Sequence, residues 1–334
     1  MGRLRYLLRR LRRMDFAAML RTARTLHEKT GKSTLWLLRD MAQCAARYSA
    51  GYVDYKIAAF YRLTPEQRRT HITRGISNDI VARMNDKAYW HFFDDKAEFN
   101  ALFAAQVRRP WIDLRVATDA LFTAFLAEQS AIICKPIDGS SGQGIQKVTR
   151  DAFGEPTALR ARLQAEGIGI VEECVVQHPA LAALCPTSVN TLRIATLLGD
   201  KQQGVVYAYL RIGNGRVMDN VDCGGMAAPV DLRTGTLCGV GADKQGDAYE
   251  HHPMTGARIP GTPIPYWQEA VRMCLEAAQV VPQVRFVAWD VAITEQGPVF
   301  IEGNSFPSHA IPQFAAHFPD GIGILPRFAE FIDL

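Results

Sequence analysis

The feature that most constrains the fold of this chain is a pair of apolar runs near its C-terminus, at 286–294 and 299–305. A short Gly-Pro turn joins the two runs, which is typical of an antiparallel β-hairpin. Side chains of a strand alternate between the two faces of a sheet, so Glu302 and Asn304 point the same way, and Asp290 can face them from the neighbouring strand. The sequence therefore predicts a hairpin with a cluster of oxygen donors on one face.

This cluster predicts a magnesium site. Two carboxylates and an amide are hard oxygen ligands, and they leave coordination positions for water and for the phosphates of a nucleotide, as Mg2+ requires. A solvated strand end is the alternative, because acidic residues are common on any protein surface. The candidate magnesium ligands are Asp290, Glu302 and Asn304.

A second segment, at 131–148, predicts a loop that covers phosphates. An apolar strand ends at Lys135 and is followed by a run rich in glycine and serine. The glycines let the backbone approach anionic oxygens, the serine hydroxyls donate hydrogen bonds, and the lysine supplies a positive charge. A Walker P-loop is excluded because the lysine precedes the glycines, whereas an ordinary hairpin turn stays an alternative. The candidate phosphate-binding residues are Lys135, Ser140, Ser141, Gly142 and Gly144.

The order of these segments resembles the ATP-grasp superfamily: a lysine strand, a Gly/Ser loop, an acidic apolar strand at 169–176, and finally the hairpin with its Asp-x11-Glu-x-Asn pattern. Four short motifs resemble most closely the sugar-transfer-associated ATP-grasp family, over roughly residues 77–312. These motifs are Gln177-His178-Pro179, Ser188-Val-Asn-Thr-Leu-Arg193, Val221-Asp222-Cys-Gly-Gly225 and Ala288-Trp-Asp290. The resemblance implies an α+β, ATP-grasp fold in which two α/β subdomains clamp ATP, with ATP and Mg2+ as cofactors.

The resemblance also implies roles for single residues of the nucleotide site. Lys135 resembles the lysine that holds the α- and β-phosphates. Lys96 resembles the second lysine of the superfamily, and Lys87 is a competing match. The segment from Glu172 through Glu173 to Val175 resembles the hinge whose backbone reads adenine. His178 is expected either to reach the ribose or to be an ordinary packed or solvated histidine. Arg193 and Arg211 resemble the arginines that meet the transferring phosphate or acyl phosphate.

The N-terminal region is basic and predicted to be helical. Residues 1–74 carry seventeen Lys and Arg but five Asp and Glu. Leucines near helical spacing, surrounded by arginines, predict an amphipathic helix within residues 1–20. This helix either binds anionic lipid at the inner membrane face or packs on its own domain or in a homodimer, and no nucleic acid is expected as a partner. A helical region up to about residue 76, including a capped start at Thr64-Pro65, stands where most ATP-grasp ligases have an α/β domain.

Composition predicts a cytoplasmic enzyme of two or three structural units. A chain of 334 residues with 48% hydrophobic content can bury a sizeable core. Seven cysteines without a Cys-x-x-Cys pair argue against a disulfide framework or structural zinc. No apolar run is long enough to span a bilayer, and the start lacks the features of a signal peptide. The expected units are a basic helical region at 1–76, an N-terminal ATP-grasp subdomain at 77–173 and a C-terminal subdomain with the metal site at 174–334.

The family resemblance implies an ATP-dependent carboxylate–amine ligase. A carboxylate would attack the γ-phosphate to give an acyl phosphate and ADP, and an amine would then displace phosphate. The expected substrates are a small-molecule carboxylate and an amine, sugar-linked, in surface-polysaccharide or related secondary metabolism. Two alternatives stay open: a phosphotransferase acting on an amide or hydroxyl, and an inactive nucleotide-binding scaffold.

Overall fold

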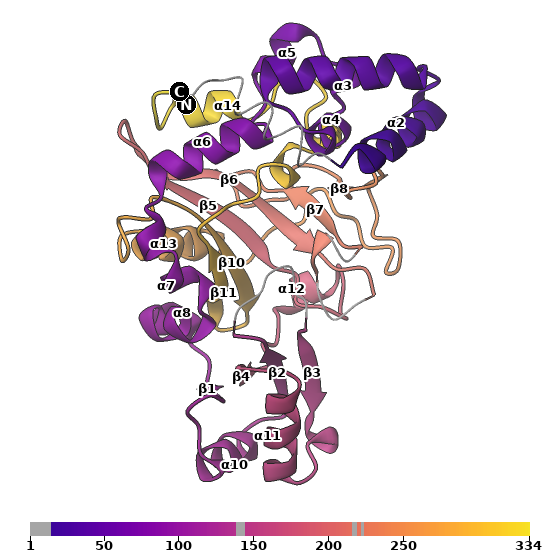
Figure 1. The fold of residues 1–334 in the computed structure, drawn as a ribbon. Coiled ribbons are helices and arrows are strands. Elements are labelled where there is room, and N and C mark those ends of the chain that lie inside the picture. The colour runs from indigo at the N-terminus through magenta and orange to yellow at the C-terminus, as the bar shows by residue number, and fades with distance from the viewer. Residues whose placement is uncertain (1–14, 138–143, 216–218, 222–223) are drawn as a thin grey trace.

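The computed structural model describes residues 15–137, 144–215, 219–221 and 224–334, and its strands form two antiparallel sheets (Figure 1). Within these residues the smaller sheet has four strands in the order β1-β4-β2-β3, and the larger has seven in the order β11-β10-β5-β6-β7-β8-β9. The smaller sheet consists of β1 (Trp111–Asp113), β2 (Ala131–Lys135), β3 (Gln146–Thr149) and β4 (Ile170–Glu173). The larger consists of β5 (Leu192–Leu198), β6 (Gln203–Ile212), β7 (Met226–Pro229), β8 (Gly241–Ala242), β9 (Ala248–Tyr249), β10 (Phe286–Thr294) and β11 (Gly297–Asn304).

The smaller sheet packs with α10 (Asp119–Ala127) and α11 (Pro156–Ala165) around a core of its own. Phe122 of α10 and Leu163 of α11 lie fully buried against Ile132 of β2. Both helices begin at a side-chain cap, since Thr118 and Glu155 each accept a hydrogen bond from a backbone N–H of the first turn.

The larger sheet buries both of its faces, as the alternation along β10 shows. Val287 and Trp289 point to one face, where α7 (His91–Asp94), α8 (Lys96–Leu102), α9 (Ala104–Val107) and α13 (Trp267–Ala278) cover the sheet. Phe286 and Ala288 point to the other face, which is covered by α6 (Arg74–Met84) and the C-terminal segment with α14 (Leu325–Ala329). Because Asp290 continues the second series, its side chain lies on the same face as Ala288.

Aromatic rings fill the first face beneath β11. The Trp289 and Phe300 rings stack at a centroid distance of 4.9 Å, and the Phe103 ring meets Trp289 edge-on. Gly303 belongs to this face, because a Cβ there would lie 2.8 Å from the Phe99 ring and 2.9 Å from the Phe93 ring. The glycine therefore allows a close contact of helix and strand between the two predicted metal ligands Glu302 and Asn304.

The N-terminal region is helical, as expected. It contains α2 (Phe16–Thr30), α3 (Thr34–Tyr48), α4 (Tyr52–Ile57) and α5 (Pro65–Arg69) before α6. The predicted start at Thr64 is confirmed, because Thr64 and Gln67 form a reciprocal capping box. Inside the helical cluster, Arg68 and Asp40 form a buried ion pair at 2.8 Å, and the Tyr55 hydroxyl donates to the same carboxylate at 2.7 Å. Most of the predicted helix at 1–20 lies outside the described residues.

The α+β class is confirmed, and the packing shows which sheet each segment joins. The helices α6 to α9, which cover residues 74–107 with their connections, pack on the larger sheet. This part of the expected 77–173 unit therefore packs with the strands of the expected 174–334 unit, and residues 111–173 form the smaller sheet and its helices. Among the described helices, none is long and apolar enough to cross a bilayer.

The predicted hairpin is confirmed. β10 and β11 pair antiparallel with Asp290 opposite Glu302, so both carboxylates lie on one face of the sheet. The register shifts directly after this pair, since Val291 lies opposite Phe300. Such a bulge twists the strands locally and changes the direction of the neighbouring side chains.

Candidate active site between the two sheets

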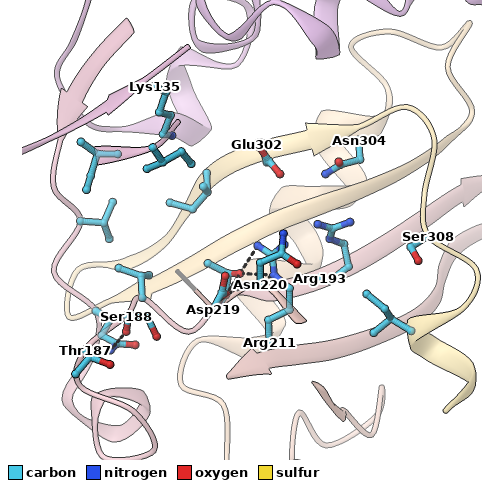
Figure 2. Close-up of a pocket in the computed structure, with 18 of the residues that line it drawn as sticks. Lys135, Thr187, Ser188, Arg193, Arg211, Asp219, Asn220, Glu302, Asn304 and Ser308 are labelled. Carbon is cyan, nitrogen blue, oxygen red and sulfur yellow. Dashed lines mark hydrogen bonds and ion pairs between the residues drawn. The ribbon is translucent and has the colours of Figure 1, made fainter. Parts of the chain in front are cut away.

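A cavity of about 1160 Å³ extends between the two sheets and up to the N-terminal helices. Its walls come from four parts of the chain: the smaller sheet, the connection that follows β4, the face of the larger sheet that carries Arg193 and Glu302, and the N-terminal region with the segment after β11. Figure 2 shows Lys135 on one side of the cavity, Glu302 and Asn304 across its middle, and Ser308 on the opposite side. The cavity therefore has a lysine end and a helix end, with the acidic residues between them.

At the lysine end, Lys135 belongs to a buried network of charges. Its ammonium lies 2.6 Å from the Glu172 carboxylate, which also accepts hydrogen bonds from Arg109 at 2.8 Å and from Asn100 at 2.8 Å. Burial raises the pKa of Glu172, but the positive charges of Arg109 and Lys135 and the hydrogen bonds from Lys135 and Asn100 outweigh it and lower the pKa to about 2. Glu172 is therefore ionised and balances the charges of Lys135 and Arg109.

The connection after β4 lines the cavity next to this network. Glu173, Val175 and Gln177 all face it, together with Cys174 and Val176. The Gln177 side chain fixes the next segment, since it donates to the carbonyl of Ser188 at 2.6 Å and accepts from the backbone N–H of Asn190 at 3.0 Å. The predicted hinge thus forms part of the cavity wall, with the Glu172 side chain engaged beneath it.

The glycine loop lies between β2 and β3. Ser140, Ser141 and Gly142 lie outside the described residues. Gly144, where the described chain resumes, has a φ of +73°, and a Cβ there would lie 2.9 Å from the Pro136 ring. A glycine is therefore required where the loop returns to β3.

The two lysine candidates take different positions. Lys96 begins α8, and its ammonium lies 3.4 Å from the carbonyl oxygen of Ile137, at the base of the glycine loop. Lys87 instead places its ammonium over the Trp90 ring, at 5.6 Å from the ring centroid. His178 caps α12 (Pro179–Ala182) and accepts the N–H of Ala180 at 3.1 Å. Lys96, Lys87 and His178 do not belong to the described lining of the cavity. Of the two roles expected for His178, its position supports a packed histidine and not a ribose contact.

Two arginines that line the middle of the cavity, Arg193 and Arg211, pair with a buried carboxylate, that of Asp290, which does not belong to the described lining. Asp290 is fully buried, and it is ion-paired with Arg193 and with Arg211, whose guanidinium nitrogens each lie 2.8 Å from one of its oxygens. Arg211 also lies 3.4 Å from Asp219 and donates to the Thr191 hydroxyl. The register of β5, β10 and β6 places both arginines beside Asp290, which brings the predicted catalytic and metal-binding residues together. Figure 2 shows the two arginines close to Asp219 and Asn220.

The acidic residues fit a divalent cation. Burial and the neighbouring carboxylate of Asp290 raise the pKa of Glu302, because two negative charges lie together in a region of low dielectric. Asn304 donates its Nδ2 to the carbonyl of Ala288 at 3.3 Å, which leaves its amide oxygen as an acceptor. The described residues contain no group of three or more His, Cys, Asp or Glu that could hold a metal by themselves. Glu302 and Asn304 line the cavity, whereas Asp290 lies outside its described lining and is paired with Arg193 and Arg211. The oxygens of these three side chains are of the kind that suits Mg2+, with its remaining ligands supplied by water and phosphate.

The helix end of the cavity contains residues that the sequence did not indicate. Asp54 and the exposed Arg74 come from the N-terminal region, and Ser308 and His309 come from the segment after β11. Asp54 and His309 are 255 positions apart and form a buried pair, with Oδ1 and Nε2 separated by 2.7 Å. Arg109 and Asn100, which hold Glu172, were also missed, because none of these residues belongs to a motif that marks it.

A comparison with protein families matches residues 76–330 to the family described as sugar-transfer associated ATP-grasp. No curated protein matches the chain. Among solved structures, D-cycloserine synthetase DcsG is 14% identical, covering 84% of this chain and 82% of that one, with a TM-score of 0.44. The ATP-grasp ligase PsnB, complexed with minimal precursor, Mg and ADP, is 13% identical over 74% of this chain and 62% of its own, with a TM-score of 0.42. The D-alanine-D-alanine ligase from Coxiella burnetii is 11% identical over 72% and 59%, with a TM-score of 0.40. This chain thus spans less than two thirds of the last two structures.

Proposed function

The chain belongs to the sugar-transfer-associated ATP-grasp family and has its fold, and from this premise we propose that it is an ATP-dependent carboxylate–amine ligase. The observation that carries the proposal is one cavity that brings together Lys135, the hinge after β4 and, on the larger sheet, Arg193, Arg211 and Glu302. Groups suited to adenine, to the phosphates and to the transferring phosphoryl group follow one another along the cavity, in the order in which these parts are connected in ATP.

ATP is proposed to lie at the lysine end. The hinge, from Glu172 to Val175, would bind adenine, and Lys135 would hold the phosphates under the glycine loop that contains Ser140, Ser141, Gly142 and Gly144. Lys96 is proposed as the second phosphate-binding lysine because its ammonium lies at the base of this loop, whereas Lys87 lies over Trp90.

Mg2+ would be held by Asp290, Glu302 and Asn304, where it would neutralise the charge that develops on the phosphates. Arg193 and Arg211 are proposed to hold the transferring phosphoryl group. Their pairing with Asp290 orders both guanidinium groups before any substrate arrives, so little reorganisation is needed during the reaction.

The proposed reaction has two steps. A carboxylate oxygen of the first substrate attacks the γ-phosphorus, the bond to the bridging oxygen breaks, and ADP leaves with that electron pair. The amine nitrogen of the second substrate then attacks the acyl carbon, loses a proton, and phosphate leaves. The protein's part is to position the two substrates and to balance charge, so no covalent intermediate on the enzyme is required.

The substrates are proposed to be small molecules linked to sugars, in surface-polysaccharide or related secondary metabolism. The description of the family as sugar-transfer associated supports this context. The exposed Arg74 at the helix end adds a positive charge next to the space left for the acceptor, which favours a substrate that carries an anionic group.

Product analysis tests the proposal. The full chain is incubated with ATP, Mg2+ and pools of amino acids and nucleotide sugars, with and without hydroxylamine, and ADP, AMP, phosphate and hydroxamate are measured separately. The ligase is expected to form ADP and hydroxamate only when a carboxylate is present. A phosphorylated acceptor without any hydroxamate would identify a phosphotransferase instead, and no ATP turnover with any pool would contradict both activities.

A further inference from the structure

Resting on the proposed ligase function, we infer that His309 is the proton acceptor for the attacking amine and that Asp54, in the N-terminal helices, is the residue that positions it. His309 lies in the segment that follows β11, five positions after the proposed metal ligand Asn304. Both residues of the pair line the cavity.

The contacts of Asp54 fix the carboxylate at both oxygens. Its Oδ1 lies 2.7 Å from the Nε2 of His309, and its Oδ2 accepts the backbone N–H groups of Gly51 at 2.7 Å and of Arg74 at 3.1 Å. A carboxylate held in this way accepts a hydrogen bond from Nε2–H of the imidazole. The lone pair of the ring is then on Nδ1, which is the arrangement that a general base needs.

The backbone of His309 is also held in place by hydrogen bonds. Its backbone carbonyl accepts a hydrogen bond from the Gln313 side chain at 2.8 Å, and the amide oxygen of Gln313 accepts the N–H of Ile72 at 2.9 Å. The side chain of His309 is 9% exposed and that of Asp54 is 7% exposed. Among the described residues no hydrogen-bond partner of Nδ1 is found, although His309 lines the cavity, so this nitrogen can accept a proton from a molecule inside it.

The place of the pair in the cavity suits the second substrate. Figure 2 shows Ser308 beyond Asn304 and opposite Lys135, and His309 is the next residue of the chain, so its backbone lies at the end of the cavity away from the lysine. An amine is protonated at neutral pH and must lose a proton before it can attack the acyl phosphate. The Asp54 carboxylate would stabilise the imidazolium that results from this transfer.

Asp54 lies outside the part of the chain that matches the family, which begins at residue 76, whereas His309 lies inside it. The orientation of the proposed base is therefore supplied by the helices that precede the ATP-grasp fold. This gives the N-terminal region a role in the reaction, in addition to closing one end of the cavity.

The test compares two nucleophiles. Hydroxylamine is largely unprotonated at neutral pH and needs no base, whereas the amines of an amino-acid pool are protonated. His309→Gln keeps a donor near the position of Nε2 and removes the basic nitrogen. We expect hydroxamate formation to stay within about twofold of the wild type and amide formation to fall by about 10²-fold or more. Asp54→Asn should have a similar selective effect, because its NH₂ group would face Nε2 and leave the proton on Nδ1.

His317→Gln is the matched control, since this histidine donates from Nε2 to the backbone carbonyl of Val240, 3.0 Å away, and does not belong to the described cavity lining. Both rates should be unchanged in it. Equal losses of hydroxamate and amide formation in His309→Gln would show that His309 has a structural role only. Unchanged amide formation would show that His309 is not the base. Either result overturns the inference. A wild-type protein that forms hydroxamate but no amide from any amine of the pool refutes the role of His309 while the acyl-phosphate step stands. If it forms no hydroxamate with any carboxylate, the ligase proposal fails and the inference with it.

Discussion

Replacing Glu172 by glutamine should destabilise the protein in a pH-dependent way. The neutral amide would leave the buried charges of Lys135 and Arg109 without their carboxylate partner. In the wild type the pKa of Glu172 falls from the ordinary 4.5 to about 2. At about 1.4 kcal/mol for each unit of pKa, ionised Glu172 contributes about 3 kcal/mol to the free energy of unfolding at neutral pH.

The direction of the pH dependence follows from the lowered pKa. The contribution of Glu172 is complete above pH 4.5, where the carboxyl would be ionised in the unfolded chain as well, and it is lost as the pH falls toward 2. The difference between the wild type and Glu172→Gln should therefore be constant from pH 7 to about 5 and shrink below that.

Urea-induced unfolding, followed by tryptophan fluorescence between pH 3 and 7, measures this difference. Glu173→Gln is the matched control, because Glu173 is the exposed next residue of the same strand, and its replacement should change the free energy of unfolding by less than about 0.5 kcal/mol. A Glu172→Gln variant as stable as the wild type at pH 7, or a difference that grows on acidification, would show that Glu172 does not stabilise the fold through its charge.

Three further predictions concern the hairpin. Glu302→Gln should abolish Mg2+-dependent turnover and leave the fold intact by circular dichroism, whereas Glu295→Gln in the exposed turn of the same hairpin should be fully active; activity in the first variant would exclude Glu302 from the metal site. Asp290→Asn leaves the buried Arg193 without its carboxylate partner, while Arg211 keeps Asp219, and should lower the free energy of unfolding by about 3–5 kcal/mol, against at most about 1 kcal/mol for the exposed Asp200→Asn. Gly303→Ala places a Cβ against two phenylalanine rings and should cost about 1–3 kcal/mol and raise the Mg2+ concentration needed for activity; an unchanged melting temperature would contradict this packing.

The hairpin and the capping box could be predicted because their signals are local. Alternation of apolar and polar residues determines the face on which Glu302 and Asn304 lie. The side chains of Thr64 and Gln67 accept hydrogen bonds from each other's backbone N–H groups, within one turn of helix. The family match at 76–330 confirms the ATP-grasp fold that the order of the motifs indicated.

The contacts between distant segments could not be predicted in the same way. Arg109 and Glu172 are 63 positions apart, and no pattern in either segment indicates the other. The packing of α6 to α9 illustrates a second reason, because an amphipathic helix shows which of its faces is apolar but not which sheet will cover it. The choice between Lys96 and Lys87 likewise depends on where the glycine loop begins in space.

The helix end of the cavity combines residues from before the family-matched region with Ser308 and His309 from within it, and this bears on how such proteins diverge. Lys135 and the hinge come from within the family-matched region, whereas residues 51–54 and 74 come from before it. Substitutions in the second set change the shape and charge of one end without touching the first. If the nucleotide binds at the lysine end, as proposed, a lineage can acquire new acceptor preferences through its leading helices while that end stays the same. Comparison of the leading helices among relatives should then separate them by substrate better than comparison of the ATP-grasp strands.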